Sequence, residues 1–130
     1  MTESIIGQKS KAFAIRIVKF YKYMTEDKKE FVMSKQILRS GTSIGANVRE
    51  SRNAQSDSDF ISKLNIALKE ADETCYWLEV MLGSEVITKQ EFDKIYCDCE
   101  EIVKLLVSSI KTLKLGKVRG ERSFEVRSER

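Results

Sequence analysis

The sequence predicts an all-α protein that folds as an up-down-up-down antiparallel four-helix bundle. The chain of 130 residues contains no proline and only six glycines, whereas strand-rich folds of this length need many turns, which depend on both residues. Hydrophobic residues recur at three- and four-residue steps in four segments, which is the spacing of one helix face. Short polar stretches separate these segments, so we expect the four apolar faces to share one core.

The first helix is predicted from about Lys9 to Met24. Its apolar face is formed by Phe13, Ile17, Phe20, Tyr21 and Met24. The opposite face is expected to carry five basic residues: Lys9, Lys11, Arg16, Lys19 and Lys22. Residues 25–27 interrupt the pattern and are predicted to cap the next helix.

The second helix is predicted from about Asp27 to Asn53, and its inward stripe contains Gly41 and Gly45. A glycine inside a helix costs roughly 1 kcal/mol relative to alanine. Two interpretations remain equally open. Either the helix breaks locally near residues 41–43, or another helix approaches closely, which glycine permits.

The third and fourth helices have clear start signals. Residues 56–59, Ser-Asp-Ser-Asp, combine small polar caps with acids at the positive end of the helix dipole. This helix is expected to end at Gly83-Ser84. Residues 88–91, Thr-Lys-Gln-Glu, match a capping box, which opens a fourth helix with an apolar stripe from Phe92 to Leu113.

The apolar pattern stops after Gly116. We therefore predict a bundle domain over residues 1–115 and a charged, flexible tail over residues 116–130.

The N-terminus lacks a charged segment followed by an apolar run, so no signal peptide is expected. No apolar stretch approaches ~18 residues, so no membrane segment is expected. Three cysteines are an odd number without a disulfide framework, which favours a reducing cytoplasm.

Residues suited to catalysis or metal binding are scarce. The chain contains no histidine, the usual general base and the commonest metal ligand. Cys97 and Cys99 lack the spacing of a zinc site. Cys75 and Cys99 lie in core stripes, where we expect them to pack as small hydrophobic residues, with Cys97 nearer the surface. The sequence therefore predicts a protein that is not an enzyme and has no metal or cofactor.

Charge is distributed unevenly along the chain. The net charge is only +3, yet residues 1–24 carry five basic residues against Glu3 alone, whereas residues 56–87 are mainly acidic. This asymmetry suits an anionic partner, head-to-tail self-association, or both. Phosphate backbones bind basic surfaces through counterion release. The candidate nucleic-acid-binding residues are Lys9, Lys11, Arg16, Lys19, Lys22, Arg39, Arg49 and Arg52.

The second helix carries an unusual polar stripe, formed by Arg39, Ser43, Asn47 and Glu50. We favour a structural interpretation, in which Asn47 and Glu50 hydrogen-bond neighbouring helices and fix the register of the bundle. The alternative is an edge that binds an anion or a partner through Arg39, Arg49 and Arg52.

Three apolar residues project away from the core stripe of the third helix: Ile66, Trp77 and Val80. Three such residues on one outward face, including the single tryptophan, indicate a subunit interface. In the alternative interpretation, the fourth helix covers them.

Part of the sequence resembles a known family. The run from Ser34 to Glu50, followed by Asp59-Phe60 and by residues 64–70, resembles the four-helix-bundle proteins encoded in intervening sequences of bacterial 23S ribosomal RNA genes, often labelled S23 ribosomal protein-like. The resemblance covers roughly residues 9–114. Ser43, Asn47 and Glu50 match the family motif.

The resemblance implies an up-down four-helix bundle and a ring-like homopentamer. It also implies a positive surface for nucleic acid, because a related accessory protein of diversity-generating retroelements is thought to bind nucleic acid and a reverse transcriptase in this way. The first functional hypothesis is therefore a non-catalytic oligomeric bundle that binds RNA or an RNA–protein assembly. The alternative is a protein–protein interaction module that does not bind nucleic acid.

Overall fold

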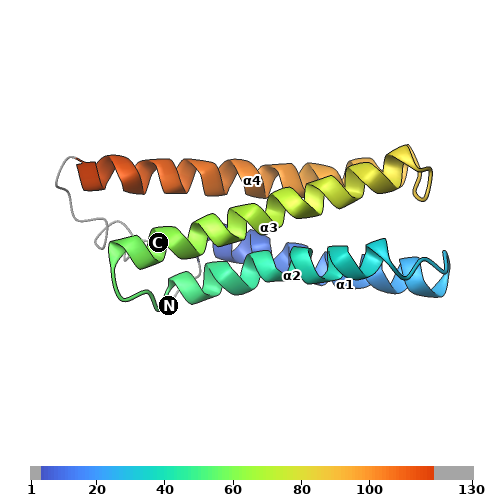
Figure 1. The fold of residues 1–130 in the computed structure, drawn as a ribbon, viewed down its shortest axis with the longest axis horizontal. Coiled ribbons are helices and arrows are strands. Elements are labelled where there is room, and N and C mark those ends of the chain that lie inside the picture. Colours follow the sequence, from blue (N-terminus) through green and yellow to red (C-terminus); the bar gives the residue numbers. More distant parts are fainter. Residues whose placement is uncertain (1–3, 119–130) are drawn as a thin grey trace.

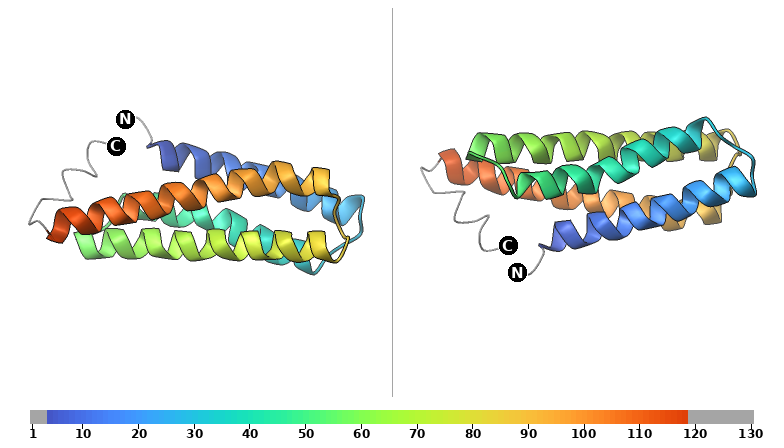
Figure 2. Two further views of the ribbon diagram at one scale, coloured as in Figure 1. Left: turned by 90° about the horizontal axis from the view of Figure 1, so that it is seen from above. Right: turned by 90° about the horizontal axis from the view of Figure 1, so that it is seen from below.

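The computed structural model describes residues 4–118 and contains four helices: α1 (Ile5–Glu26), α2 (Met33–Ser51), α3 (Asp57–Gly83) and α4 (Lys89–Val118). No strand occurs within residues 4–118, so the predicted all-α four-helix fold is confirmed. The helices lie side by side, and the chain reverses direction at each of the three connecting loops (Figures 1 and 2). This alternation is what the predicted up-down-up-down arrangement requires.

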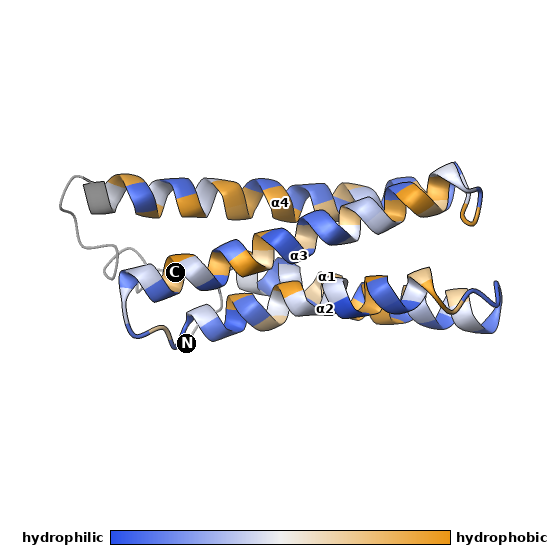
Figure 3. Ribbon diagram, in the orientation of Figure 1, coloured by the Kyte–Doolittle hydropathy of each residue, from blue (hydrophilic) through white to orange (hydrophobic). Residues whose placement is uncertain are grey.

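One hydrophobic core fills the space between the four helices. Apolar and polar bands alternate along each helix (Figure 3), and the apolar side chains form a single buried cluster. Ile17, Ile44, Leu78 and Leu106, one from each helix, are each 0% exposed. Burying one such side chain contributes roughly 1.5–3 kcal/mol. No helix within residues 4–118 is long and apolar enough to cross a membrane.

Helix α1 begins four residues before its predicted start at Lys9. The side chain of Ser4 accepts a hydrogen bond from the backbone N–H of Gly7 at 3.0 Å, which caps the helix. Ile6 then joins the buried core, one turn before Ser10 and two turns before Phe13. The signal missed in the sequence was therefore the capping serine that precedes the first apolar residue.

Helix α2 begins at Met33, six residues after its predicted start, and residues 25–27 do not cap it. Lys29 has φ of 57°, a left-handed conformation that a continuous helix excludes. The Glu30 carboxylate accepts hydrogen bonds from the N–H groups of Val32, Met33 and Ser34 at 3.0, 2.9 and 2.8 Å. Glu30 therefore satisfies the exposed N–H groups at the start of α2.

Glycine in α2 serves close helix packing, because the helix runs unbroken through residues 41–43. A Cβ atom on Gly41 would lie 2.8 Å from Cγ1 of Ile17 in α1. A Cβ atom on Gly45 would lie 3.2 Å from the carbonyl oxygen of Ser10. The structure therefore decides between the two interpretations in favour of close approach.

The predicted starts of α3 and α4 are confirmed. The Ser56 side chain accepts a hydrogen bond from the Asp59 N–H at 3.1 Å. The capping box of α4 is complete, since Glu91 N–H donates to Thr88 Oγ1 at 3.1 Å and Thr88 N–H donates to Glu91 Oε1 at 2.8 Å. Helix α3 ends at Gly83 as expected, whereas α4 continues past Leu113 to Val118. Most of the predicted tail, residues 119–130, lies outside the described residues.

The contact between Gly41 and Ile17 predicts the effect of adding one methyl group. We expect Gly41→Ala to lower the free energy of unfolding by about 1–2 kcal/mol, because overpacking against Ile17 outweighs the higher helix propensity of alanine. Urea unfolding measures this difference. Gly83→Ala is the control, because an added Cβ there would meet no atom within 4 Å beyond its chain neighbours and the backbone of its own helix. A Gly41→Ala variant at least as stable as the parent protein would contradict the packing argument.

The capping role of Glu30 predicts a pH-dependent stability. Burial alone raises the pKa of Glu30, but hydrogen bonds from Met33, Ser34 and Val32 outweigh burial and hold that pKa below its ordinary value. A lowered folded-state pKa stabilises the protein above the unfolded-state pKa, and this contribution is lost as the pH falls through the folded-state pKa. We expect Glu30→Gln to reduce the free energy of unfolding by about 1 kcal/mol near neutral pH.

The difference between Glu30→Gln and the parent protein should begin to shrink as the pH falls below the ordinary glutamate pKa of about 4.3, and it should disappear once the pH is below the lowered pKa of the folded carboxyl. Urea unfolding of both proteins across this pH range measures it. Glu26→Gln, at an exposed position near the end of α1, is the control. A destabilisation by Glu30→Gln that is equally large in acid would show that the charge does not contribute.

Candidate nucleic-acid interface

A basic cleft of about 240 Å³ lies between α1 and α2. Its lining combines small residues with cations at one end of the helix pair. The small residues are Gly7, Ala14, Gly45 and Ala46. The cations are Lys11, Arg49 and Arg52.

Small residues make this cleft possible. Gly7 and Ala14 are seven residues apart in α1, so they occupy the same face of the helix. Gly45 of α2 lies opposite them, where the backbones approach so closely that a Cβ atom would contact the Ser10 carbonyl oxygen. Most of the side chains that line the cleft are small, and the longer Lys11 and Arg49 side chains line it as well.

The structure brings together three of the eight predicted binding residues at the cleft: Lys11, Arg49 and Arg52. Lys19 and Lys22 are exposed on α1. Within residues 4–118, Lys11, Lys19 and Lys22 form no ion pair. The sequence placed the basic residues of α1 and those of α2 in separate groups and did not show that they meet. The signal that could have indicated this contact between α1 and α2 was the seven-residue spacing of the small residues Gly7 and Ala14, together with the glycines of α2.

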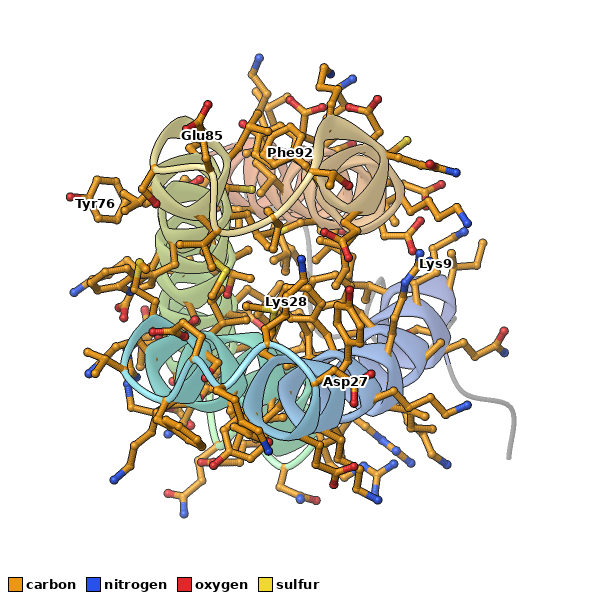
Figure 4. The ribbon with its side chains drawn as sticks, turned by 90° about the vertical axis from the view of Figure 1, so that its right-hand side faces the viewer. Lys9, Asp27, Lys28, Tyr76, Glu85 and Phe92 are labelled. Carbon is orange, nitrogen blue, oxygen red and sulfur yellow. The ribbon has the colours of Figure 1, made fainter. Side chains whose placement is uncertain are left out.

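Lys9 and Arg16 do not belong to this surface, which corrects the prediction of one basic face on α1. Lys9 Nζ lies 3.3 Å from Glu101 Oε2, and Arg16 Nη1 lies 2.5 Å from Asp98 Oδ2. Both acids belong to α4, and Lys9 lies at the side of the bundle between α1 and α4 (Figure 4). The two basic residues sit on the flank of α1, where α4 carboxylates neutralise their charge.

A third link between α1 and α4 joins Tyr23 to Glu91. The Tyr23 hydroxyl donates a hydrogen bond to Glu91 Oε2, and Lys28 Nζ lies 3.7 Å from Glu91 Oε1. The hydrogen bond from Tyr23, followed by that from the Thr88 N–H, holds the pKa of Glu91 below its ordinary value. The same bond raises the pKa of Tyr23. Polar contacts thus join α1 to α4 along the seam from Lys9 to Lys28.

Arg39 is directed to α3 and does not line the cleft with Arg49 and Arg52, so the structure does not bring together the three arginines of the alternative interpretation. Arg39 Nη1 lies 3.3 Å from Glu70 Oε1, and Arg39 Nη2 donates to Glu73. The hydrogen bond to Glu73 is the main reason that the pKa of Arg39 is raised. Arg39 therefore pairs with acids across the α2–α3 seam, whereas Arg49 and Arg52 lie on the α1 side.

The motif residues Ser43, Asn47 and Glu50 divide into two groups. Ser43 Oγ donates to the Arg39 carbonyl at 2.6 Å, and Asn47 Nδ2 donates to the Ser43 carbonyl at 2.9 Å. These bonds stay within α2, so the prediction that Asn47 bonds a neighbouring helix is wrong. Glu50 does reach α3, since its Oε1 lies 3.3 Å from Lys63 Nζ.

The buried polar link between α2 and α3 lies elsewhere. The hydroxyl oxygens of Ser40 and Thr74 are 2.8 Å apart, and both residues are fully buried. Thr74 Oγ1 also donates to the Glu70 carbonyl at 2.8 Å, so Ser40 is the donor to Thr74. This bond fixes the alignment of the two helices, because sliding them would take the acceptor away from the buried Ser40 hydroxyl. Sequence reasoning missed this pair because small hydroxyl residues are common on both helices.

Ile66, Trp77 and Val80 lie on one side of α3. Ile66 is 38% exposed, whereas Trp77 is partly buried against the core and donates from Nε1 to Glu73 Oε2 at 3.4 Å. Val80 is also partly exposed. Tyr76, next to Trp77, projects away from the bundle (Figure 4) and is 57% exposed. The surface predicted as a subunit interface is thus partly open in this chain.

The cysteines lie where the sequence predicted. Cys75 and Cys99 are buried, and Cys97 is exposed. Within the part of the chain that the structure describes, no three or more cysteine, aspartate or glutamate side chains are grouped so as to hold a metal ion.

Comparison with known proteins places this architecture among relatives. A family model described as 23S rRNA-intervening sequence protein matches residues 2–108. The chain is also similar to a solved structure of a protein with unknown function from the S23 ribosomal protein family of Bacteroides thetaiotaomicron VPI-5482. The two are 60% identical with a TM-score of 0.81, and the match covers 82% of this chain and 99% of that chain. No curated protein matches the sequence.

Proposed function

The chain belongs to the 23S rRNA-intervening sequence protein family, and we propose that it is a non-catalytic, oligomeric four-helix bundle that binds RNA, or an RNA–protein assembly, through the basic cleft between α1 and α2. The observation that carries this proposal is the convergence of Lys11, Arg49 and Arg52 around one concave surface. These cations come from two helices and face a region with small side chains, which a phosphate group can approach.

The chemistry of the cleft favours the RNA backbone over its bases. Guanidinium and ammonium groups bind phosphate oxygens through charge-assisted hydrogen bonds. Among residues 4–118, no aromatic residue lines the cleft, so this part of the chain offers no ring there on which an unpaired base can stack. We therefore expect binding that depends strongly on salt and weakly on sequence.

Self-association would strengthen such a surface. One subunit contributes a small group of cations, and repetition around an oligomer raises the affinity for a long polyanion through effective concentration. The side of α3 with Ile66, Trp77 and Val80 is the interface that we propose. A homopentamer is the stoichiometry implied by the family resemblance and stays a prediction.

Charge reversal at the cleft tests RNA binding directly. We expect Lys11→Glu/Arg49→Glu to weaken binding of a short labelled single-stranded RNA on the order of tenfold at low salt, because two phosphate contacts become repulsive. The slope of log affinity against log salt should become shallower by roughly 0.7 for each lost contact. A filter-binding titration at several salt concentrations measures both quantities.

The matched control is Lys69→Glu/Lys94→Glu, which changes the net charge equally at exposed positions of α3 and α4. Lys9→Ala/Arg16→Ala is a second comparison and should weaken binding less than cleft reversal, because α4 carboxylates already neutralise these residues. Equal losses in the cleft and control variants would disprove the assigned site. Absence of RNA binding by the parent protein at low salt would refute the RNA function.

The exposed side of α3 supports the alternative, a protein–protein interaction module. Ile66 and Tyr76 are 38% and 57% exposed beside the partly buried Trp77, a combination typical of contact surfaces with an aromatic anchor. Recovery of one protein partner that survives nuclease treatment and is lost in Ile66→Asp would favour this function over RNA binding.

A further inference from the structure

Two buried thiols face each other across the α3–α4 seam. Cys75 of α3 donates its S–H to Cys99 Sγ of α4, with the sulfur atoms 3.1 Å apart. Cys99 in turn donates its S–H to the Ala71 carbonyl at 3.3 Å. Both cysteines are free. A disulfide has a sulfur–sulfur bond of about 2.05 Å, so the pair needs to close by only about 1 Å to become covalent.

One of the two thiols borders the surface. A second cleft, of about 260 Å³, lies between α3 and α4 and is lined by Cys75 but not by Cys99. Cys75 is 9% exposed, whereas Cys99 is 0% exposed. A small reagent that enters this cleft therefore meets Cys75 first.

We propose that Cys75 and Cys99 form an oxidation site, at which an uncharged peroxide converts the two thiols into an α3–α4 disulfide. The Cys75 thiol gives up its proton as its sulfur attacks one peroxide oxygen and the O–O bond breaks. Cys75 becomes a sulfenic acid, and the departing hydroxide takes up the thiol proton and leaves as water. The Cys99 sulfur then attacks the Cys75 sulfur, and the Cys99 proton leaves with the displaced hydroxide as water. For hydrogen peroxide, two thiols and one peroxide give one disulfide and two waters.

The surroundings assign the roles of the two sulfurs. The hydrogen bond with Cys75, together with burial, raises the pKa of the Cys99 thiol, so Cys99 stays protonated until the second step. The Cys75 side chain lines the cleft, so its sulfur can react with a reagent that enters the cleft. This division is typical of a reacting cysteine with an adjacent resolving cysteine.

The charge of the α3–α4 cleft selects the type of oxidant. Its lining includes three carboxylates, Asp72, Glu79 and Glu100, against the single cation Lys104. Like charges repel an anionic disulfide such as oxidised glutathione, and the small cleft restricts bulky reagents. Hydrogen peroxide is neutral and small, so it meets neither obstacle.

Oxidation should stabilise the bundle. The two cysteines are separated by 24 positions and belong to helices that are already packed together. A cross-link between them closes the chain segment that contains the α3–α4 loop, which reduces the freedom of the unfolded chain more than that of the folded chain. The melting temperature of the oxidised protein should therefore exceed that of the reduced protein.

The test uses the full chain with Cys97→Ser, which removes the exposed thiol and leaves only the buried pair. After hydrogen peroxide treatment of the folded protein, we expect the intact mass to fall by two hydrogens and both free thiols to disappear. Tryptic peptides 70–89 and 95–104, which hold Cys75 and Cys99, should separate only after reduction. The melting temperature should rise on oxidation and return on reduction.

Oxidation that requires denaturant, or peroxide treatment that leaves both thiols free, would overturn the proposal. So would covalent dimers formed in place of the internal cross-link. Oxidation by glutathione disulfide as fast as by hydrogen peroxide would overturn the assignment of a neutral oxidant. In the same background, Cys75→Ala should show no rise in melting temperature with peroxide. The mass and peptide measurements on Cys97→Ser decide the question even if that second variant does not fold.

Discussion

The close approach of α1 and α2 is the contact on which the rest of the structure depends. Gly41 leaves room for the Ile17 side chain, and Gly45 allows the helix backbone to reach the Ser10 carbonyl. Because Ile17 and Ile44 are also fully buried, this contact fixes where α1 stands relative to the core. It also leaves a concave surface above the small residues, where Lys11 and Arg49 face the same space.

The position of α1 decides the use of its charges. Its flank toward α4 carries Lys9 and Arg16, which α4 carboxylates pair, while its flank toward α2 carries Lys11 beside the cleft. Exposed ion pairs contribute little to stability, typically below about 1 kcal/mol, so the pairs toward α4 serve mainly to neutralise charge. The cations that line the cleft, Lys11, Arg49 and Arg52, lie on the α1–α2 side, where we propose that RNA binds.

The sequence predicted the number, type and order of the helices because each apolar stripe is long and each of the last two helices has an unambiguous cap. The predicted start of α2 was wrong because the residue that caps the helix is Glu30, which is not a usual N-cap residue, and because the sequence did not indicate the left-handed conformation of Lys29 that interrupts the chain before it. The sequence predicted all three charged residues of the cleft, Lys11, Arg49 and Arg52, as binding residues. It did not predict that they lie together, because helical periodicity defines the faces of one helix and does not show which faces of two helices contact each other. The Cys75–Cys99 contact was not predicted for the same reason, and the Ser40–Thr74 contact was harder still to predict because small hydroxyl residues are common on both helices.

The central claim is that α2 carries glycine at position 41 to admit Ile17, and a double-mutant cycle tests it most directly. Urea unfolding would compare the parent protein, Gly41→Ala, Ile17→Ala and the double variant. Removing Ile17 takes away the atoms that the new methyl group would meet, so the account predicts that Gly41→Ala destabilises the parent but is neutral or stabilising once Ile17 is alanine. An equal cost of Gly41→Ala in both backgrounds would show that the glycine does not serve this contact.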